Sequence, residues 1–151
     1  KDIDKLIKED DHLSHLYRLV SSVIGIGPVT ATAIIVQTLG FTRFTPEQPR
    51  SFANFEGLVP RKFESGKSVR RKRKGLSKKG RSIKSLLTMG AKNAIRNDPQ
   101  IKQYAEQKLQ QGKHYFVVIN NVRNKLIDRA FAAVRKNTMY VKNMNISLVN
   151  T

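Results

Sequence analysis

Apolar residues at three- and four-residue steps run through most of this chain, and this spacing favours helices over strands. The first stripe starts at Ile3, ends at Ile24 and is broken only at Asp10. It predicts one long amphipathic helix over residues 1–22. We expect this helix to be the end of a coiled-coil linker through which copies of the chain associate.

Glycine and proline divide the rest of the chain into further helical segments. Helices are expected from Val29 to about Leu39, from about Arg50 to Phe55, after Gly80, from Pro99 to about Gln111, and from His114 to Lys136. In the last of these, the residues expected in the core are Val118, Val122, Leu126, Ile127, Ala130 and Val134. The pattern predicts a mostly α domain over residues 23–141. A tail that frays from Asn137 onward would end in a flexible segment at 142–151.

The charge of the chain indicates a polyanionic partner. Lys and Arg number 29 against 11 Asp and Glu, which gives a net charge of +18. Nucleic acid is the first candidate. An anionic membrane surface is a weaker one, because the basic stretch lacks an apolar face. The absence of cysteine excludes disulfides and thiolate metal sites, and no apolar run is long enough to span a membrane.

The basic residues concentrate in one segment. Between Arg61 and Lys84 there are twelve Lys or Arg and one acid, Glu64. Apolar periodicity is missing between Lys62 and Gly75, so a loop or short hairpin is expected there. Phe63 is the only aromatic residue among these charges, which favours duplex or structured nucleic acid over a base-stacking platform.

The stretch Gly25-Ile26-Gly27-Pro28 separates two of the expected helices. Glycines let a backbone approach a phosphate closely, and a helix that starts at Pro28 would direct free N–H groups at it. This pattern is typical of a helix-hairpin-helix element that binds the DNA backbone. A tight corner between two helices with no ligand is the alternative.

Two serines of the basic segment are candidates for phosphate chemistry. Ser65 has Gly66 beside it and cations around it that could clamp a phosphate, whereas Ser77 precedes a helix and suits an N-cap. The residues alone leave the role of Ser65 open, because no clear general base accompanies it. The acids are scattered, and His12 and His15 lack a third ligand, so we expect no metal or cofactor in this chain.

The order of these motifs resembles that of the C-terminal domain of insertion-sequence 110/116/902 type transposases, relatives of the Piv invertases. The motifs are Gly25-Ile26-Gly27-Pro28 with Thr30-Ala31, Phe52-Ala53-x-Phe55, Gly57-Leu58-x-Pro60, Ser65-Gly66 and Ser77-Lys78-x-Gly80. The similarity extends from about Val20 to Val141. One departure is Arg81, which stands where the family usually has Asn.

The resemblance implies a site-specific DNA recombinase that acts in the bacterial cytoplasm at the nucleoid. It implies an N-terminal RuvC-like domain with Mg²⁺-binding acids, and in some members a structured guide RNA. Because this chain starts without Met inside a helical pattern, we expect that domain to lie outside it. The resemblance also implies that Ser65 is the serine that attaches to DNA, and that Ser77, Lys78 and Gly80 contact the DNA backbone.

We predict that this chain binds DNA and supplies Ser65 for strand transfer. A non-catalytic DNA- or RNA-binding module with the same hairpin is the alternative. The predicted nucleic-acid contacts are Gly25, Gly27, Thr30, Arg61, Lys62, Gly66, Lys67, Arg70, Arg71, Lys72, Arg73, Lys74, Ser77, Lys78, Lys79, Gly80 and Arg81.

Overall fold

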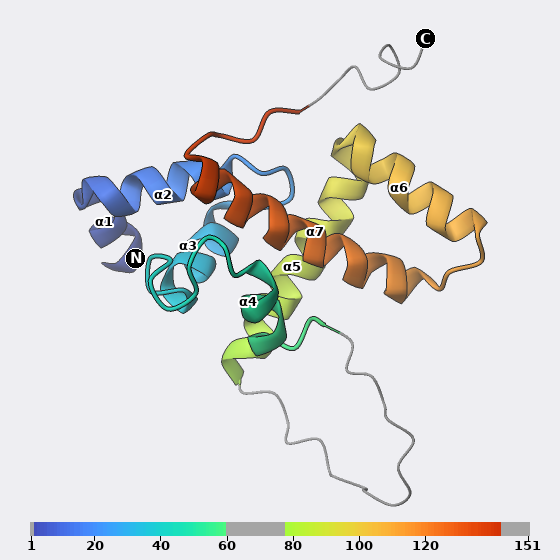
Figure 1. The fold of residues 1–151 in the computed structure, drawn as a ribbon, viewed down its shortest axis with the longest axis horizontal. Coiled ribbons are helices and arrows are strands. Elements are labelled where there is room, and N and C mark those ends of the chain that lie inside the picture. The colour runs from blue at the N-terminus through green and yellow to red at the C-terminus, as the bar shows by residue number, and fades with distance from the viewer. Residues whose placement is uncertain (1, 60–77, 143–151) are drawn as a thin grey trace, which may run out of the picture.

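A computed structural model describes residues 2–59 and 78–142 of the protein, and every regular element within them is a helix (Figure 1). The helices are α1 (Asp2–Glu9), α2 (Asp11–Ser21), α3 (Pro28–Gln37), α4 (Pro49–Phe55), α5 (Lys78–Asn97), α6 (Pro99–Gln110) and α7 (Tyr115–Lys136). The prediction of a mostly α fold is confirmed. The predicted basic loop or hairpin at residues 62–75 and the tail from residue 143 lie outside the described residues.

The N-terminal stripe forms two helices, and the prediction of one continuous helix is wrong. The chain leaves the helical conformation at Asp10 (φ −97°, ψ 118°), and the Asp10 side chain accepts a hydrogen bond of 2.9 Å from the Leu13 N–H. Asp favours this N-cap geometry because its carboxylate satisfies an N–H that the first helical turn leaves free. The one acid that interrupts the stripe therefore ends α1 and starts α2.

Helix α7 is the centre of the fold. It crosses the middle of the molecule in front of α5 and packs against α2, α4, α5 and α6 (Figure 1). Five of the six core positions expected on α7 are buried, and the sixth, Val134, is partly buried against the core. Burial of this many apolar side chains is the main force that holds the helices together.

Phe131 of α7 adds aromatic contacts that the helical pattern does not single out. Its ring lies 4.9 Å from the ring of Phe41 and 5.5 Å from that of Phe52, measured between centroids. Phe52 belongs to α4, and Phe41 lies in the segment between α3 and α4. These contacts fix α4 on α7 and so position the chain just before residue 60.

The corner between α5 and α6 follows the sequence prediction and is anchored to α7. Asp98 caps α6 by accepting hydrogen bonds from the N–H groups of Gln100 (2.9 Å) and Ile101 (3.3 Å). Its other carboxylate oxygen accepts from Arg129 Nη1 of α7 at 2.7 Å. A buried carboxylate with this many donors joins three helices at one point.

The chain after α7 does not fray at Asn137, contrary to the sequence prediction. Asn137 ends α7 in the left-handed conformation (φ 51°), and the chain then returns along the protein. The Tyr140 N–H donates to Ser22 Oγ at 2.8 Å, and the Tyr140 hydroxyl donates to Asp98 Oδ2 at 3.1 Å. Tyr140 therefore ties this segment to the end of α2 and to the α5–α6 corner.

Helices α3 and α6 depart from full burial of their apolar residues. Val29 and Val36 of α3 are exposed, so only one side of α3 faces the core. On α6, Ile101 and Ala105 are buried, but Leu109 is 43% exposed. Both departures occur near a helix end, where fewer neighbouring elements are available to cover a side chain.

Candidate nucleic-acid interface

The turn between α2 and α3 has a closed side and an open side. Gly25 adopts φ +98°, a conformation that L residues with a side chain rarely adopt. A Cβ on Gly25 would lie 2.6 Å from the carbonyl oxygen of Gly90 in α5. The missing side chain of Gly25 thus permits close packing of the turn on α5. The side of Gly25 that lacks a side chain is therefore occupied by α5 and leaves no space there for a phosphate.

Gly27 forms the open side of the same turn. It is the N-cap residue of α3, and a Cβ built on it would meet no atom within 4 Å in the described part of the protein. Pro28 follows at the first helical position, and no described side chain caps α3. The start of α3 therefore offers N–H groups and the positive end of the helix dipole to a ligand.

The remaining predicted contacts of α3 and α5 differ in how they are placed. Thr30 is 5% exposed and lies against the core, whereas its neighbour Val29 is 68% exposed. The backbone of Lys78, Lys79, Gly80 and Arg81 forms the first turn of α5, and α5 packs on α3. These four residues therefore begin a helix that contacts α3, the helix whose start is open to a ligand.

The other predicted site residues lie outside the described residues. These are the proposed nucleophile Ser65 and the contacts Arg61, Lys62, Gly66, Lys67, Arg70, Arg71, Lys72, Arg73, Lys74 and Ser77. Their roles stay predictions.

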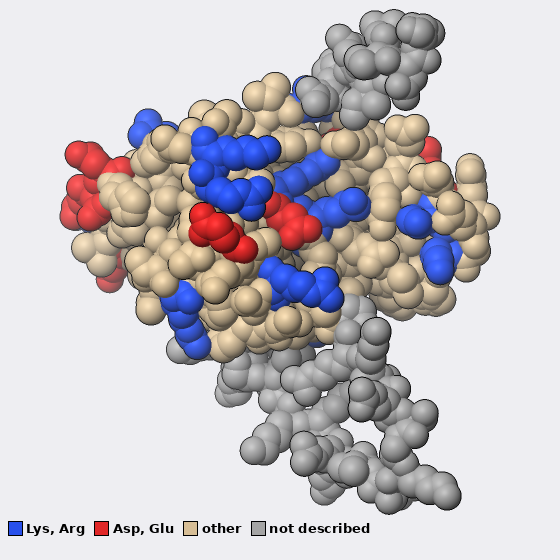
Figure 2. Space-filling view, in the orientation of Figure 1, with Lys and Arg blue, Asp and Glu red and all other residues tan. Residues whose placement is uncertain are grey.

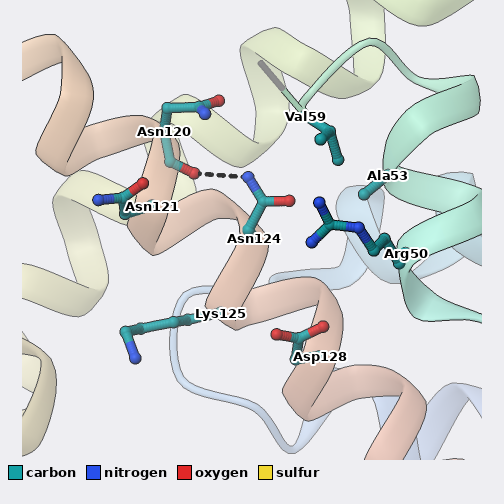
Figure 3. A pocket seen from close by; sticks show the side chains of 8 residues that line it. All are labelled: Arg50, Ala53, Val59, Asn120, Asn121, Asn124, Lys125 and Asp128. Carbon is teal, nitrogen blue, oxygen red and sulfur yellow. Dashed lines mark hydrogen bonds between the residues drawn. The ribbon is translucent and has the colours of Figure 1, made fainter. Parts of the chain in front are cut away.

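A groove over α7 adds polar residues that the sequence prediction missed. Between α4 and α7, a hollow of about 310 Å³ is lined by Arg50, Ala53, Val59, Asn120, Asn121, Asn124, Lys125 and Asp128 (Figure 3). Between α6 and α7, a second hollow of about 410 Å³ is lined by Gln100, Ile101, Tyr104, Lys125, Asp128 and Arg129. Lys125 and Asp128 line both hollows, which together are called the α7 groove below.

The walls of the α7 groove are held by hydrogen bonds. Asn124 Nδ2 donates to the Leu58 carbonyl at 3.1 Å and to the Asn120 carbonyl at 2.9 Å. Arg123 donates to Asn120 Oδ1 at 2.7 Å and to Thr88 Oγ1 of α5 at 3.2 Å. These bonds fix the segment before residue 60 against α7. The sequence signal that could have shown this face is the repeat of amides and charges at three- and four-residue steps in α7.

Basic side chains predominate in the groove. Figure 2 shows several Lys and Arg on the face that carries α7, with a few acids among them. Within the groove, Arg50, Lys125 and Arg129 face one acid, Asp128. Burial raises the pKa of Asp128, and the positive charges of Lys125 and Arg50 act in the opposite direction. The groove therefore attracts anions and contains one carboxylate, that of Asp128.

Neither a metal cluster nor a membrane span is found in residues 2–59 and 78–142. No three His, Cys, Asp or Glu there are grouped so that they could hold a metal ion. No helix of that part is both long and apolar enough to cross a membrane.

Comparison with known proteins decides the family. A model of the Transposase IS116/IS110/IS902 family matches residues 17–106, more than half of the chain. The chain belongs to this family. A comparison with curated proteins gives no match. The resemblance inferred from the motifs is confirmed, and it identifies a transposase domain whose process is transposition, a form of DNA recombination.

The residues matched to the transposase family include the turn at Gly25–Gly27 and extend through the start of α5 into α6. They end at Glu106, earlier than the Val141 expected from the motifs. Helix α7, with half of the residues that line the α7 groove, therefore lies beyond the matched range.

Proposed function

We propose that this transposase domain binds the DNA backbone at the start of α3 and with its basic segment, and that it presents Ser65 as the nucleophile of strand transfer. The observation that carries the binding part is the open, uncapped start of α3 at Gly27 in a chain of the transposase family. Helix starts of this kind bind phosphates without reading sequence.

The charge balance supports DNA as the ligand. A net charge of +18 is neutralised best by a polyanion, and twelve of the cations follow one another closely between Arg61 and Lys84. Each phosphate contacted should add about 0.9 to the slope of log affinity against log salt for duplex DNA. In family members that use a guide RNA, the same cations would also contact its backbone.

The chemical part of the proposal concerns Ser65. Its hydroxyl would attack a phosphodiester, form a serine–phosphate bond and release a 3′ or 5′ hydroxyl, while nearby Arg and Lys stabilise the charge on the phosphate oxygens. We propose that the Mg²⁺ and the general base come from the RuvC-like domain that the family resemblance implies. The expected association of copies through the N-terminal helices would bring several such serines to one DNA site.

Substitution of Ser65 tests the chemical part. In the full-length protein, Ser65→Ala should lower recombination by about 10³-fold or more, because removal of a nucleophile abolishes its covalent step. Ser68→Ala is the matched control, because it removes a hydroxyl from the same basic segment. Denaturing gels that detect a covalent protein–DNA adduct report the step directly. An unchanged rate and adduct yield in Ser65→Ala would favour the non-catalytic binding module, and the same result with loss in Ser77→Ala would move the role to Ser77.

Substitution of Gly27 tests the binding part. Gly27→Asp should weaken binding of any duplex sequence by about tenfold, because a carboxylate would meet the phosphate. Gly27→Asn is the control of equal size. Both side chains suit an N-cap, so the fold should keep its stability. Equal affinities of the two variants in fluorescence anisotropy would show that the turn is only a corner.

A further inference from the structure

The α7 groove has the dimensions of a small-ligand site, and it is divided in two. Its hollows of about 310 and 410 Å³ fall at the lower end of the range for ligand pockets. They share Lys125 and Asp128, so they adjoin along α7. A ligand that fills both hollows must extend along α7.

Some polar groups of the groove are used by the fold, and others are available. The side chains of Asn120 and Asn124 hold Arg123 and Leu58, as described above. By contrast, Arg50 and Asn121 make no hydrogen bond with any described residue, although both line the groove. Figure 3 shows Arg50 reaching from α4 toward Asn124. The available groups are thus a guanidinium and an amide on facing elements.

The position of Asn121 costs helix stability. Asn ranks among the poorer helix formers because its amide competes for backbone hydrogen bonds, and α7 carries three of them within five residues. Asn120 and Asn124 offset part of this cost through their hydrogen bonds, whereas Asn121 makes no side-chain hydrogen bond in the described part of the protein. An interaction with a ligand would account for an amide at this position.

The combined chemistry of the groove matches a nucleotide chain. Arg50 and Lys125 suit phosphates, while an amide and a carboxylate suit the hydrogen-bonding edges of bases. A duplex keeps those edges inside its own grooves, and here the Asn121 amide lines the hollow between α4 and α7. Only a strand with unpaired bases can insert an edge there.

We infer that the α7 groove binds a single-stranded stretch of nucleic acid and reads its bases. Arg50 and Lys125 contact the backbone, and Asn121 and Asp128 contact base edges in adjoining hollows. The inference rests on the proposed binding of nucleic acid, but it concerns a surface different from the start of α3. Val59, at one wall, is followed in the sequence by Pro60 and then by the basic residues from Arg61.

Anisotropy with labelled oligonucleotides tests the groove. The probes are 12-nucleotide single strands of DNA and of RNA with mixed sequence, and a 20-base-pair duplex. Asn121→Ala, which removes a base contact, and Lys125→Gln, which removes a backbone contact, should each weaken binding of at least one single-stranded probe by about five- to tenfold. Duplex affinity should change less than about twofold.

Lys92→Gln is the matched control for charge, because Lys92 is exposed on α5 and lines neither hollow. Thermal unfolding confirms that each variant folds. Unchanged single-strand binding, or equal loss of single-strand and duplex binding, would overturn the inference, because the groove would then be unoccupied or part of a general basic surface. Failure of the chain to bind any probe would instead overturn the proposed function. Comparison of the DNA and RNA strands identifies which nucleic acid the groove takes.

Discussion

Gly25 and Gly27 lie two residues apart in one turn, and the structure gives them opposite surroundings. Gly25 has positive φ and faces the backbone of Gly90 in α5, whereas Gly27 has φ −83° and open space where a side chain would be. A sequence motif with two glycines thus combines a packing position with an exposed one. The motif alone does not distinguish them, because glycine suits both a close packing contact and an open turn.

The same contrast separates the inside of the fold from its candidate interface. Gly25, Gly90 and Asp98 fix how the helices pack, and substitutions there should act mainly on stability. Gly27 and the α7 groove lie at the surface, and substitutions there should act mainly on binding. Measurements of unfolding therefore test the role of the interior residues, and measurements of binding test the role of the surface residues.

The largest effect is expected at Gly25. Gly25→Ala should lower the free energy of unfolding by about 4 kcal/mol, because it adds strain at positive φ to a clash with the Gly90 carbonyl oxygen. This is a large share of the stability of a typical domain. Thermal and urea unfolding of the purified chain measure the change.

Gly112→Ala is the matched control for Gly25→Ala. Gly112 also has positive φ (+81°), but its Cβ would meet no described atom within 4 Å. Its substitution should cost only the backbone strain, about 1 kcal/mol. If the two variants lost equal stability, the close packing of the turn on α5 would be contradicted.

A smaller loss is expected at Asp98. Asp98→Ala should lower the free energy of unfolding by about 3 kcal/mol, because it removes an N-cap and leaves the Arg129 guanidinium without its acceptor. The exposed N-cap Asp10 gives the control, and Asp10→Ala should cost about 1 kcal/mol. Similar losses would mean that the links to α7 and Tyr140 contribute nothing beyond capping.

The pH dependence of the Asp98 contribution has a defined sign. Burial by itself would raise the pKa of Asp98. The hydrogen bond from Arg129 and the Ile101 N–H, the charge of Arg129 and the Tyr140 hydroxyl outweigh it, so the pKa is lowered from 3.8. The stability from this carboxylate is therefore present above pH 3.8 and is lost as the pH falls through the lower folded-state pKa. The free energies of unfolding of wild type and Asp98→Asn should therefore converge as the pH falls below the folded-state pKa.

Local sequence rules predicted most of the helices. Periodicity located the core of α7, and the Asn97-Asp98-Pro99 sequence located the α5–α6 corner, because both signals depend on neighbouring residues. The same rules missed the break at Asp10 and the return of Tyr140 to Asp98. A hydrogen bond between residues 42 positions apart depends on the tertiary fold and leaves no local pattern.

The candidate site was less predictable than the fold. The open start of α3 was expected from Gly27-Pro28, but the packing of Gly25 on Gly90 brings together residues from distant helices. The α7 groove was missed for the same reason, since Arg50 and Asn121 belong to separate helices and neither forms a motif. Composition suggested a polyanionic partner, but composition cannot locate a groove.

The smallest effect is expected at Glu56. Glu56 lies in the interior, but unlike Gly25 and Asp98 it is expected to lower stability. Glu56 is 1% exposed, and its Oε1 has no hydrogen-bond partner among the residues that the structure describes, unlike the carboxylate of Asp98. Burial raises the pKa of Glu56 above its ordinary value of 4.5, and the charge of Arg43 offsets only part of this. Because the charged form is disfavoured in the fold, Glu56 lowers stability increasingly as the pH rises above 4.5.

Glu56→Gln should therefore raise the free energy of unfolding by about 1 kcal/mol at pH 7, since it removes a buried charge without changing the side chain's size. The gain should shrink as the pH falls below 4.5, where the wild-type carboxyl is also neutral. Urea unfolding at pH 4 and pH 7 gives both differences, with Glu106→Gln on exposed α6 surface as the control. If Glu56→Gln instead lowered the free energy of unfolding at pH 7, the Glu56 carboxylate would have to be stabilised by a group of the fold. Glu56 would then resemble Asp98, whose carboxylate is hydrogen-bonded.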